Sequence, residues 1–430
     1  MLIRIGLNTR VKNKNYCQQG FCIRRAEVQN STVVFQLNIS NKLGFCASTS
    51  RPNAKPRNVS RDFRKNRHQM TRHIFTILLI LINYSVFAND GAFFAKGNQL
   101  IPINETEITV RKEILTLKKV RNKFIEVTVY YEFFNPNEDK KLTVGFEAFS
   151  PEGDVDGTPK NGHHPYMRDF TVELNNNILK YNVAYVSDSL YTENGKIKSK
   201  GIPKFDDNAS LNYVDFYYVY HFEANFKKGV NIIKHTYNYD LSGSIDYNYD
   251  FEYVLTAANR WANKQIDDFT LIIDIGEFET FSINKSFYKN ANEWLLNGIG
   301  KTEDVKGVKN SFIENDATKF HLQKGNLIFQ KKNFKINGDL FLYAQNYIGI
   351  QNLEYIPFSY YQEENINEPK NDLQRKILKN LPFARRGYVF QNQELNTFYK
   401  KMDWYISNPN YEPNTEILTE NEKKWTEKWK

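Results

Sequence analysis

Cysteine is confined to the first 46 residues of this 430-residue chain, at Cys17, Cys22 and Cys46. The residues that follow therefore have neither disulfides nor thiolate metal ligands available to them. No Gly-x-Ser-x-Gly, no His-Glu-x-x-His and no glycine-rich phosphate loop occurs. These absences disfavour nucleophilic hydrolases, zinc proteases and nucleotide-binding enzymes. A pair of carboxylates acting on a glycosidic bond has no fixed sequence spacing, so that class of enzyme stays open.

Long hydrophobic runs are also missing. A membrane span needs about 20 apolar residues, and no run in the chain is that long. The run Ile74–Ile82 is shorter, follows Arg72, and precedes small residues that end at Ala88. This order is typical of a secretory signal peptide over residues 70–88. A buried core strand is the alternative interpretation. We expect cleavage near Ala88 and an extracytoplasmic product, either periplasmic or secreted, with no transmembrane segment in the mature chain.

Acidic residues are scarce in the first 69 positions, where fourteen Lys and Arg face only Glu27 and Asp62. Because a signal peptide stands at the start of a protein, Met70 is the expected initiator. Residues 1–69 are then an upstream extension from a mistaken start, and we expect them to be disordered. The alternative is a basic nucleic-acid-binding arm, with its densest cluster at Arg61, Arg64, Lys65 and Arg67.

The whole-chain net charge of +9 comes from this extension. Without those residues and Arg72, the remaining chain carries a net charge of about −4. We therefore expect no nucleic-acid partner for the mature protein.

Alternating apolar and polar residues dominate the chain from Asn104 to about Tyr355. This period of two, with turn residues between the runs and no amphipathic helices, predicts antiparallel strands that form a β-sandwich. We assign residues 89–265 to a β-sandwich domain. Residues 266–361 form a second β-layer or a smaller β-domain, and residues 284–317 within them read as a long loop with a short helix near Trp294.

The composition changes after an acidic linker at residues 362–370. Asn371 can cap a helix that begins at Asp372, and Gly387 is placed to end it. A second helix is expected over residues 394–402. Thr419 and Glu422 form a capping-box pattern ahead of a third helix. The fold class is therefore mainly β, followed by a small all-α domain at residues 371–430.

The C-terminal domain contains Phe383-Ala384-Arg385-Arg386-Gly387, followed by a Trp404-Tyr405 pair. This stretch resembles the YARHG domain, a bacterial extracellular module, with Phe383 in place of its Tyr and Arg386 in place of its His. The resemblance implies export, and any chemistry of the family's His would be absent here. The segments 90–115 and 255–271 are similar to the secreted β-rich domain of unknown function that accompanies YARHG modules.

The loop Gly153–Tyr166 gathers four metal-ligating side chains: Asp154, Asp156, His163 and His164. Two carboxylates and an imidazole could hold a divalent metal ion. Adjacent histidines in an extended segment point in opposite directions, however, and a flexible turn explains the same composition. No cofactor is predicted, and a divalent metal remains possible at this loop.

Aromatic density is highest around Tyr218 and Tyr220. If exposed, their rings could stack on sugar faces or on a partner surface, whereas cross-strand packing in a core explains them equally. A second candidate binding group is Arg385 and Arg386 with Trp404. An arginine fork can bind a carboxylate or phosphate of a cell-wall polymer, or it can form an internal salt bridge to an acid of the same module, such as Glu394 or Asp403. For Arg385 we expect the salt bridge.

The sequence thus favours an exported, non-enzymatic protein that binds a cell-envelope polymer or a protein partner. The alternative is an envelope hydrolase that uses acidic residues, with or without a metal ion. No catalytic residue is assigned.

Overall fold

The computed structural model describes residues 8–18, 21–32, 99–102, 107–151, 155–186, 197, 199–201, 205, 214–244, 246–308, 314–346, 353–360 and 366–430. The signal peptide expected at residues 70–88 lies outside this set. The chain divides into two compact units, residues 1–88 and 89–430. Across the described part of the chain, none of the helices has both the length and the apolar character to cross a membrane.

The first unit contains a two-stranded antiparallel hairpin, formed by β1 (Asn8–Gln18) and β2 (Phe21–Thr32). The structure therefore differs from the disorder that we expect for residues 1–69. Sequence periodicity missed these strands because the first 69 residues show no sustained alternation of apolar residues. An isolated pair of strands is marginally stable in water.

The second unit contains two sheets. The smaller is antiparallel, with strand order β3-β6-β10-β9. Its strands are β3 (Gln99–Pro102), β6 (Lys140–Ala148), β9 (Asn182–Val186) and β10 (Tyr217–Phe226).

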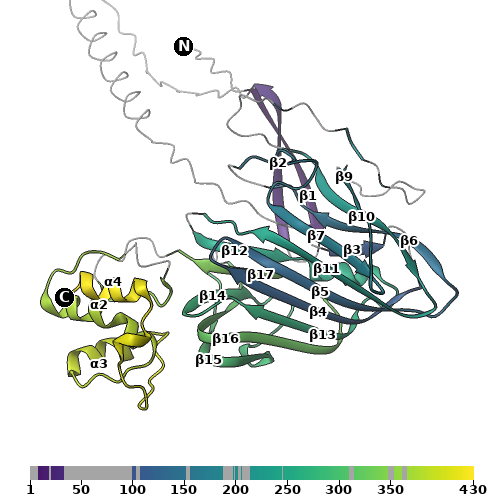
Figure 1. Cartoon of the computed structure of the whole chain (residues 1–430). Helices are drawn as coiled ribbons and strands as arrows, with labels where there is room; N and C mark the ends of the chain where they lie inside the picture. Colours follow the sequence, from purple (N-terminus) through teal and green to yellow (C-terminus); the bar gives the residue numbers. More distant parts are fainter. Residues whose placement is uncertain are drawn as a thin grey trace, which may run out of the picture. The chain divides into compact units, whose positions relative to one another are not determined.

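The larger sheet has 11 strands in the order β12-β17-β14-β16-β13-β4-β5-β11-β7-β8, and β15 pairs with β16 beside this path (Figure 1). Its strands are β4 (Thr109–Val120), β5 (Phe124–Asn135), β7 (Met167–Leu174), β8 (Asn177–Ile178), β11 (Gly229–Asp240), β12 (Tyr247–Tyr253), β13 (Ile266–Asp274), β14 (Glu279–Asn284), β15 (Trp294–Val305), β16 (Ala317–Phe334) and β17 (Leu340–Gln345).

One strand pair makes the large sheet mixed. β13 runs parallel to β4, with Ile266 opposite Val110. The sheet is therefore continuous across residue 265, where the sequence analysis placed a boundary between two β regions. Alternation within each strand predicts the strands but carries no information on which strands become neighbours, so the sequence could not reveal this pairing.

Aromatic side chains fill the space between the two sheets. Phe146 of β6 and Tyr220 of β10 contact Phe170 of β7, with ring centroids 5.2 and 4.9 Å from it. On β11, His235 and Tyr237 also face Phe146. This packing is the core of the predicted sandwich, built on the inward-facing positions of alternating strands.

Two short 3₁₀ helices interrupt the strands, η1 (Leu255–Arg260) and η2 (Ala291–Glu293). The helix expected near Trp294 is η2, but the long loop expected over residues 284–317 contains the 12-residue strand β15. Glycines at 298 and 300 and a polar second half break the apolar alternation of this strand, which is why the sequence pattern did not reveal it.

The C-terminal region is helical, as expected. Its elements are α2 (Asp372–Arg385), α3 (Gln393–Lys400), η4 (Thr415–Ile417) and α4 (Glu420–Lys428). The Asn371 side chain caps α2, and Thr419 with Glu422 forms the capping box of α4. Gly387 follows α2 at φ +86°, a conformation that favours glycine.

The helical module begins earlier than the sequence suggested. Leu353, Ile356 and Phe358 belong to the same hydrophobic cluster as the apolar faces of α2 and α3. This cluster also includes Phe278, which precedes β14, so the module packs against the end of the large sheet. Of the linker expected at residues 362–370, the first four residues lie outside the described part of the chain.

Candidate functional site

The histidine loop does not present its imidazoles together. His164 is buried, accepts a hydrogen bond from the Tyr166 backbone N–H at Nδ1, and donates from Nε2 to the Phe149 carbonyl oxygen. Burial lowers the pKa of His164 to about 3, so the ring is neutral. His163 is half-exposed and contacts the Asn161 carbonyl oxygen through Nδ1. Both ring nitrogens of His164 are thus occupied by hydrogen bonds, and His163 makes a separate contact.

Of the two carboxylates of this loop, the structure describes only Asp156. Asp156 accepts hydrogen bonds from the backbone N–H and the hydroxyl of Thr158, as in a tight turn. Asp154 lies outside the described residues.

Tyr218 and Tyr220 are core residues. Both are at most 1% exposed. The Tyr218 hydroxyl donates to the Gly157 carbonyl oxygen, and the Tyr220 hydroxyl accepts from the His164 backbone N–H. Their rings therefore hold the 157–164 loop against β10, and they offer no exposed stacking surface.

The arginine fork is also internal. Arg386 forms a bidentate ion pair with Glu422 of α4, with N–O distances of 2.6 and 2.9 Å. The Tyr360 hydroxyl donates to the same carboxylate. Burial alone would raise the pKa of Glu422, but the hydrogen bonds from Arg386 and Tyr360 outweigh it and lower that pKa. An internal salt bridge is thus present at Arg386 with Glu422 as its partner, whereas the sequence favoured one at Arg385 with Glu394 or Asp403.

Arg385 and Trp404 contribute to the same packing. Arg385 is 2% exposed, and its guanidinium donates to the Pro357 and Ser359 carbonyl oxygens and lies over the Tyr360 ring. The Trp404 indole is 1% exposed and donates to the Ile356 carbonyl oxygen. These contacts fasten residues 356–360 to the helices.

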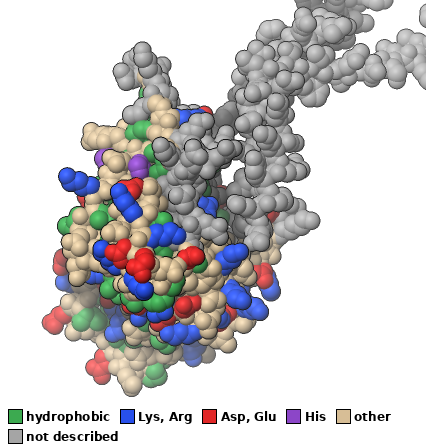
Figure 2. All heavy atoms as spheres, turned by 90° about the vertical axis from the view of Figure 1, so that its right-hand side faces the viewer, with side chains coloured by type: hydrophobic (Ala, Val, Ile, Leu, Met, Phe, Trp, Pro, Cys, Tyr) green, Lys and Arg blue, Asp and Glu red, His purple; other side chains and the backbone are tan. Residues whose placement is uncertain are grey.

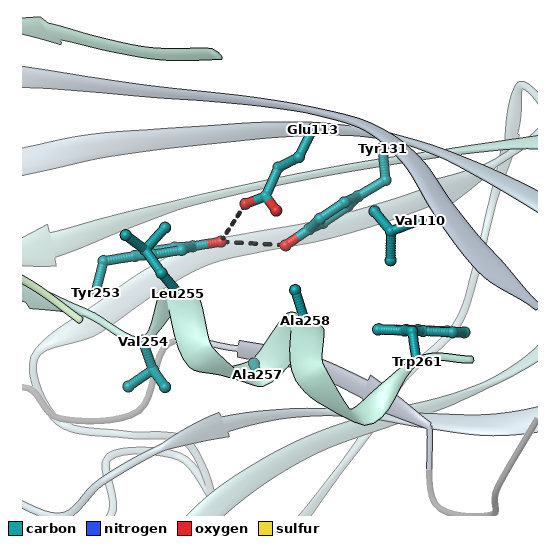
Figure 3. Close-up of a pocket in the computed structure, with 9 residues that line it drawn as sticks. All are labelled: Val110, Glu113, Tyr131, Tyr253, Val254, Leu255, Ala257, Ala258 and Trp261. Atoms are coloured by element: carbon teal, nitrogen blue, oxygen red, sulfur yellow. Dashed lines mark hydrogen bonds between the residues drawn. The ribbon is translucent and has the colours of Figure 1, made fainter. Parts of the chain in front are cut away.

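The carboxyl of Glu113 is buried next to η1. The sequence analysis did not single it out. Figure 3 shows Glu113 of β4 pointing toward the hydroxyls of Tyr131 and Tyr253. The Tyr253 hydroxyl lies 3.4 Å from Glu113 Oε1 and 3.1 Å from the Tyr131 hydroxyl. The three groups border a cavity of about 10 Å³, closed on its other side by Ala258 and Trp261. That volume is about what one water molecule needs.

Burial determines the protonation state of Glu113. It raises the pKa of this carboxyl to about 8, although hydrogen bonds from Tyr131 and Tyr253 oppose the shift. Glu113 is therefore protonated and neutral at pH 7. The alternation of β4 could have revealed it, because Glu113 is in phase with the buried Leu115 and Leu117. A carboxyl that exchanges a proton near neutrality could serve acid–base chemistry, but a cavity for one water leaves no room for a substrate.

We predict that Glu113→Gln stabilises the protein at alkaline pH. Between pH 4.5 and 8 the folded chain keeps a proton on Glu113 that the unfolded chain has released, so this group makes stability fall as pH rises. The neutral amide removes that dependence and should add about 4 kcal/mol to the free energy of unfolding at pH 8.5. Urea unfolding at pH 5 and 8.5 measures the difference. Glu126→Gln, at a half-exposed carboxylate, is the control.

A second polar group lies where the helical module meets the large sheet. Among the described residues, Glu303, His321 and Asp403 are a set of potential ligands whose atoms all lie within 4.8 Å of one another. His321 of β16 is fully buried, and its Nε2 lies 3.6 Å from Asp403 Oδ2. Lys319 Nζ reaches Asp403 Oδ2 at 2.9 Å and Glu303 Oε2 at 3.5 Å. Sequence reasoning missed this group because its members come from β15, β16 and the turn after α3.

Comparisons with known proteins give one family match and distant structural likenesses. No curated protein matches the chain. A candidate nutrient-binding protein from Legionella pneumophila is 17% identical over 80% of this chain and 100% of its own, with a TM-score of 0.41. An M1 zinc metallopeptidase from Deinococcus radiodurans is 7% identical over 66% of this chain and 54% of its own, with a TM-score of 0.21. Such distant likenesses assign no activity. Residues 358–430 match the model of the YARHG domain, so the chain carries a C-terminal YARHG domain.

Proposed function

We propose that this chain is an exported, non-catalytic protein that binds a protein partner by adding a strand of that partner to β15. The observation that carries the proposal is the outer edge of β15. Within the part of the chain that the structure describes, this 12-residue strand pairs with β16 alone. An unpaired strand presents a row of backbone N–H and C=O groups that can pair with another chain.

The first half of β15 lacks the usual protection of an edge strand. Natural edges are shortened or carry charges or proline, yet residues 294–300 contain neither charge nor proline. Leu295 in this half is 61% exposed. Strand addition uses backbone hydrogen bonds for affinity and alternate side chains for specificity, which suits an edge with an exposed apolar residue.

Of the two ligand classes that the sequence suggested, a protein partner is the better supported. Binding of a cell-envelope polymer relied on the rings of Tyr218 and Tyr220 and on the arginine fork, and these side chains are packed inside. On the face seen in Figure 2, Lys and Arg side chains are interspersed with Asp and Glu, with no broad patch of one sign. Export rests on the expected signal peptide and on the likeness of the β region to secreted domains that accompany YARHG modules.

The hydrolase alternative has one observation in its favour, the group of Glu303, His321 and Asp403. Two carboxylates and an imidazole could support acid–base or metal-assisted chemistry. Lys319 lies between the two carboxylates, however, and forms ion pairs with both. That arrangement favours a structural role over catalysis, with ion pairs that hold the helical module to the large sheet.

We predict that Leu295→Lys abolishes partner capture and leaves the fold intact. A charge at an exposed edge position opposes strand addition, whereas a surface substitution changes stability by about 0.5 kcal/mol or less. The measurement is retention of envelope proteins from the producing cells by immobilised full-length chain, with bound segments located by cross-linking. Ile417→Lys, at a residue of η4 that is 51% exposed, is the matched control.

Retention that survives Leu295→Lys, or cross-links that map away from β15, would contradict strand addition. Hydrolysis of envelope material by the wild-type chain that is lost in Asp403→Asn would establish the enzymatic alternative.

A further inference from the structure

The joint between the sheet and the YARHG domain has the donor atoms of a metal site. Glu303 projects from β15, His321 from β16, and Asp403 from the turn that follows α3. Two carboxylates and an imidazole form a mixed oxygen and nitrogen set of the kind that first-row divalent cations such as Zn²⁺ accept. The His321 Nε2–Asp403 Oδ2 distance of 3.6 Å is close to the separation of two ligand atoms around a tetrahedral metal ion.

His321 is the independent sign that a ligand belongs here. Its side chain is fully buried, and its Nε2 faces Asp403 Oδ2 at 3.6 Å, with no hydrogen-bond partner among the residues that the structure describes. The other ring nitrogen, Nδ1, lies 2.9 Å from the Thr280 hydroxyl. If that hydroxyl accepts, Nδ1 carries the proton and Nε2 keeps a lone pair that faces the two carboxylates. Metal-bound histidines are oriented in this way by a partner on the second nitrogen.

A hydrogen bond also fixes the orientation of the Asp403 carboxylate. The Tyr355 hydroxyl donates to Asp403 Oδ1 at 2.9 Å, which leaves Oδ2 turned toward His321 and Lys319.

Lys319 supplies the competing cation. Its ammonium group lies between the two carboxylates, and its side chain is 24% exposed, so it has a route to solvent. The neighbouring Lys301 instead directs its ammonium group at the Tyr405 carbonyl oxygen. A metal ion could enter only as Lys319 leaves, which would make the affinity of the wild-type site low.

We propose that Glu303, His321 and Asp403 bind a first-row divalent cation, Zn²⁺ being the test ion, in exchange for the Lys319 ammonium group. The bound ion would tie the YARHG domain to β15 and β16. This inference goes beyond the proposed function, because strand addition at the other end of β15 does not require it.

Equilibrium dialysis of the full chain against Zn²⁺ tests the proposal, with Cys17, Cys22 and Cys46 replaced by serine to remove thiolate binding. Lys319→Met, which keeps the length of the side chain and removes its charge, should bind one Zn²⁺ at least tenfold more tightly than the parent chain. Adding Glu303→Gln to Lys319→Met should reverse that gain, and Mg²⁺ should bind weakly throughout. Glu303 is exposed, so its replacement is not expected to impair folding.

The matched control is Glu420→Gln, which removes an exposed carboxylate that pairs with Lys423 on α4, and it should leave Zn²⁺ affinity unchanged. The thermal midpoint of the Lys319→Met chain should also rise with Zn²⁺ concentration, as mass action requires. If Lys319→Met binds Zn²⁺ no more tightly than its parent, or if Glu303→Gln leaves the affinity unchanged, the cluster is an ion-pair joint and the proposal fails.

Discussion

Replacing Arg386 by alanine should lower the free energy of unfolding of the YARHG domain by about 3–5 kcal/mol, because it leaves the Glu422 carboxylate buried without its cation. The side chains of this pair are 10% and 2% exposed. Glu422 also caps α4 and accepts from Tyr360. Loss of the pair should therefore weaken the N-terminus of α4 and also the contact of Tyr360, which precedes α2 in the chain.

Tryptophan fluorescence during urea unfolding measures this effect, since Trp404, Trp425 and Trp429 lie in the module and Trp261 and Trp294 in the sheets. We expect an early transition from the module and an unchanged later one. Lys423→Ala, which breaks the exposed pair with Glu420, is the matched control and should cost about 0.5 kcal/mol or less.

A double replacement tests the electrostatic origin of the loss. Arg386→Met with Glu422→Gln removes both charges and keeps a side chain that can close the capping box. The double variant should recover part of the stability lost in Arg386→Ala. If it is as unstable as the single variant, packing of the arginine stem, and not the unpaired charge, explains the loss.

Replacing His235 by phenylalanine should stabilise the protein, most strongly in acid. The ring is 1% exposed, and the imidazole stacks between Tyr131 and Tyr237. Within the described part of the chain, neither ring nitrogen has a hydrogen-bond partner. Phenylalanine keeps the stacking and removes a buried polar group whose missing hydrogen bonds cost about 1–3 kcal/mol.

The acid effect follows from proton binding. Burial lowers the pKa of His235 to about 3. Between pH 6.5 and 3 the unfolded chain binds a proton that the folded chain does not, so this group makes stability fall as pH falls. At pH 5 the gain from His235→Phe should therefore grow by about 2 kcal/mol over its value at pH 8. Urea unfolding between pH 5 and 8 measures the gain.

His164→Phe is the matched comparison. The pKa of His164 is lowered by burial to a similar value, but its two ring nitrogens are hydrogen-bonded to Tyr166 and Phe149. Its replacement should destabilise the protein at pH 8, because two backbone groups lose their partners. Equal effects of the two replacements at pH 8 would show that hydrogen-bond satisfaction does not separate these histidines.

Local signals predicted the helical module better than the sheets. Asn371, Gly387 and the Thr419–Glu422 pair act within a few residues of their own positions, so the sequence could place α2 and α4 from them. The alternation of β4 likewise predicted a strand. It could not predict that β4 would lie beside β13, because that choice depends on packing between distant segments.

The same limit applies to the candidate sites. Sequence patterns favour residues that are close in the chain, such as His163 and His164, and in the structure these two side chains make separate hydrogen bonds. The group of Glu303, His321 and Asp403 spans about 100 residues and forms only when the module docks on the sheet. Glu113 was accessible to sequence reasoning, since a carboxylate on the inward phase of a strand is itself an unusual feature.

The parallel pairing of β4 with β13 affects the order in which the chain can fold. Val110 cannot meet Ile266 until all the residues between them have been synthesised. Contacts of such long sequence separation slow folding, because the loop must close before the contact contributes. Until then one side of β4 stays open to wrong pairing partners, so this edge is where misfolding and aggregation would begin.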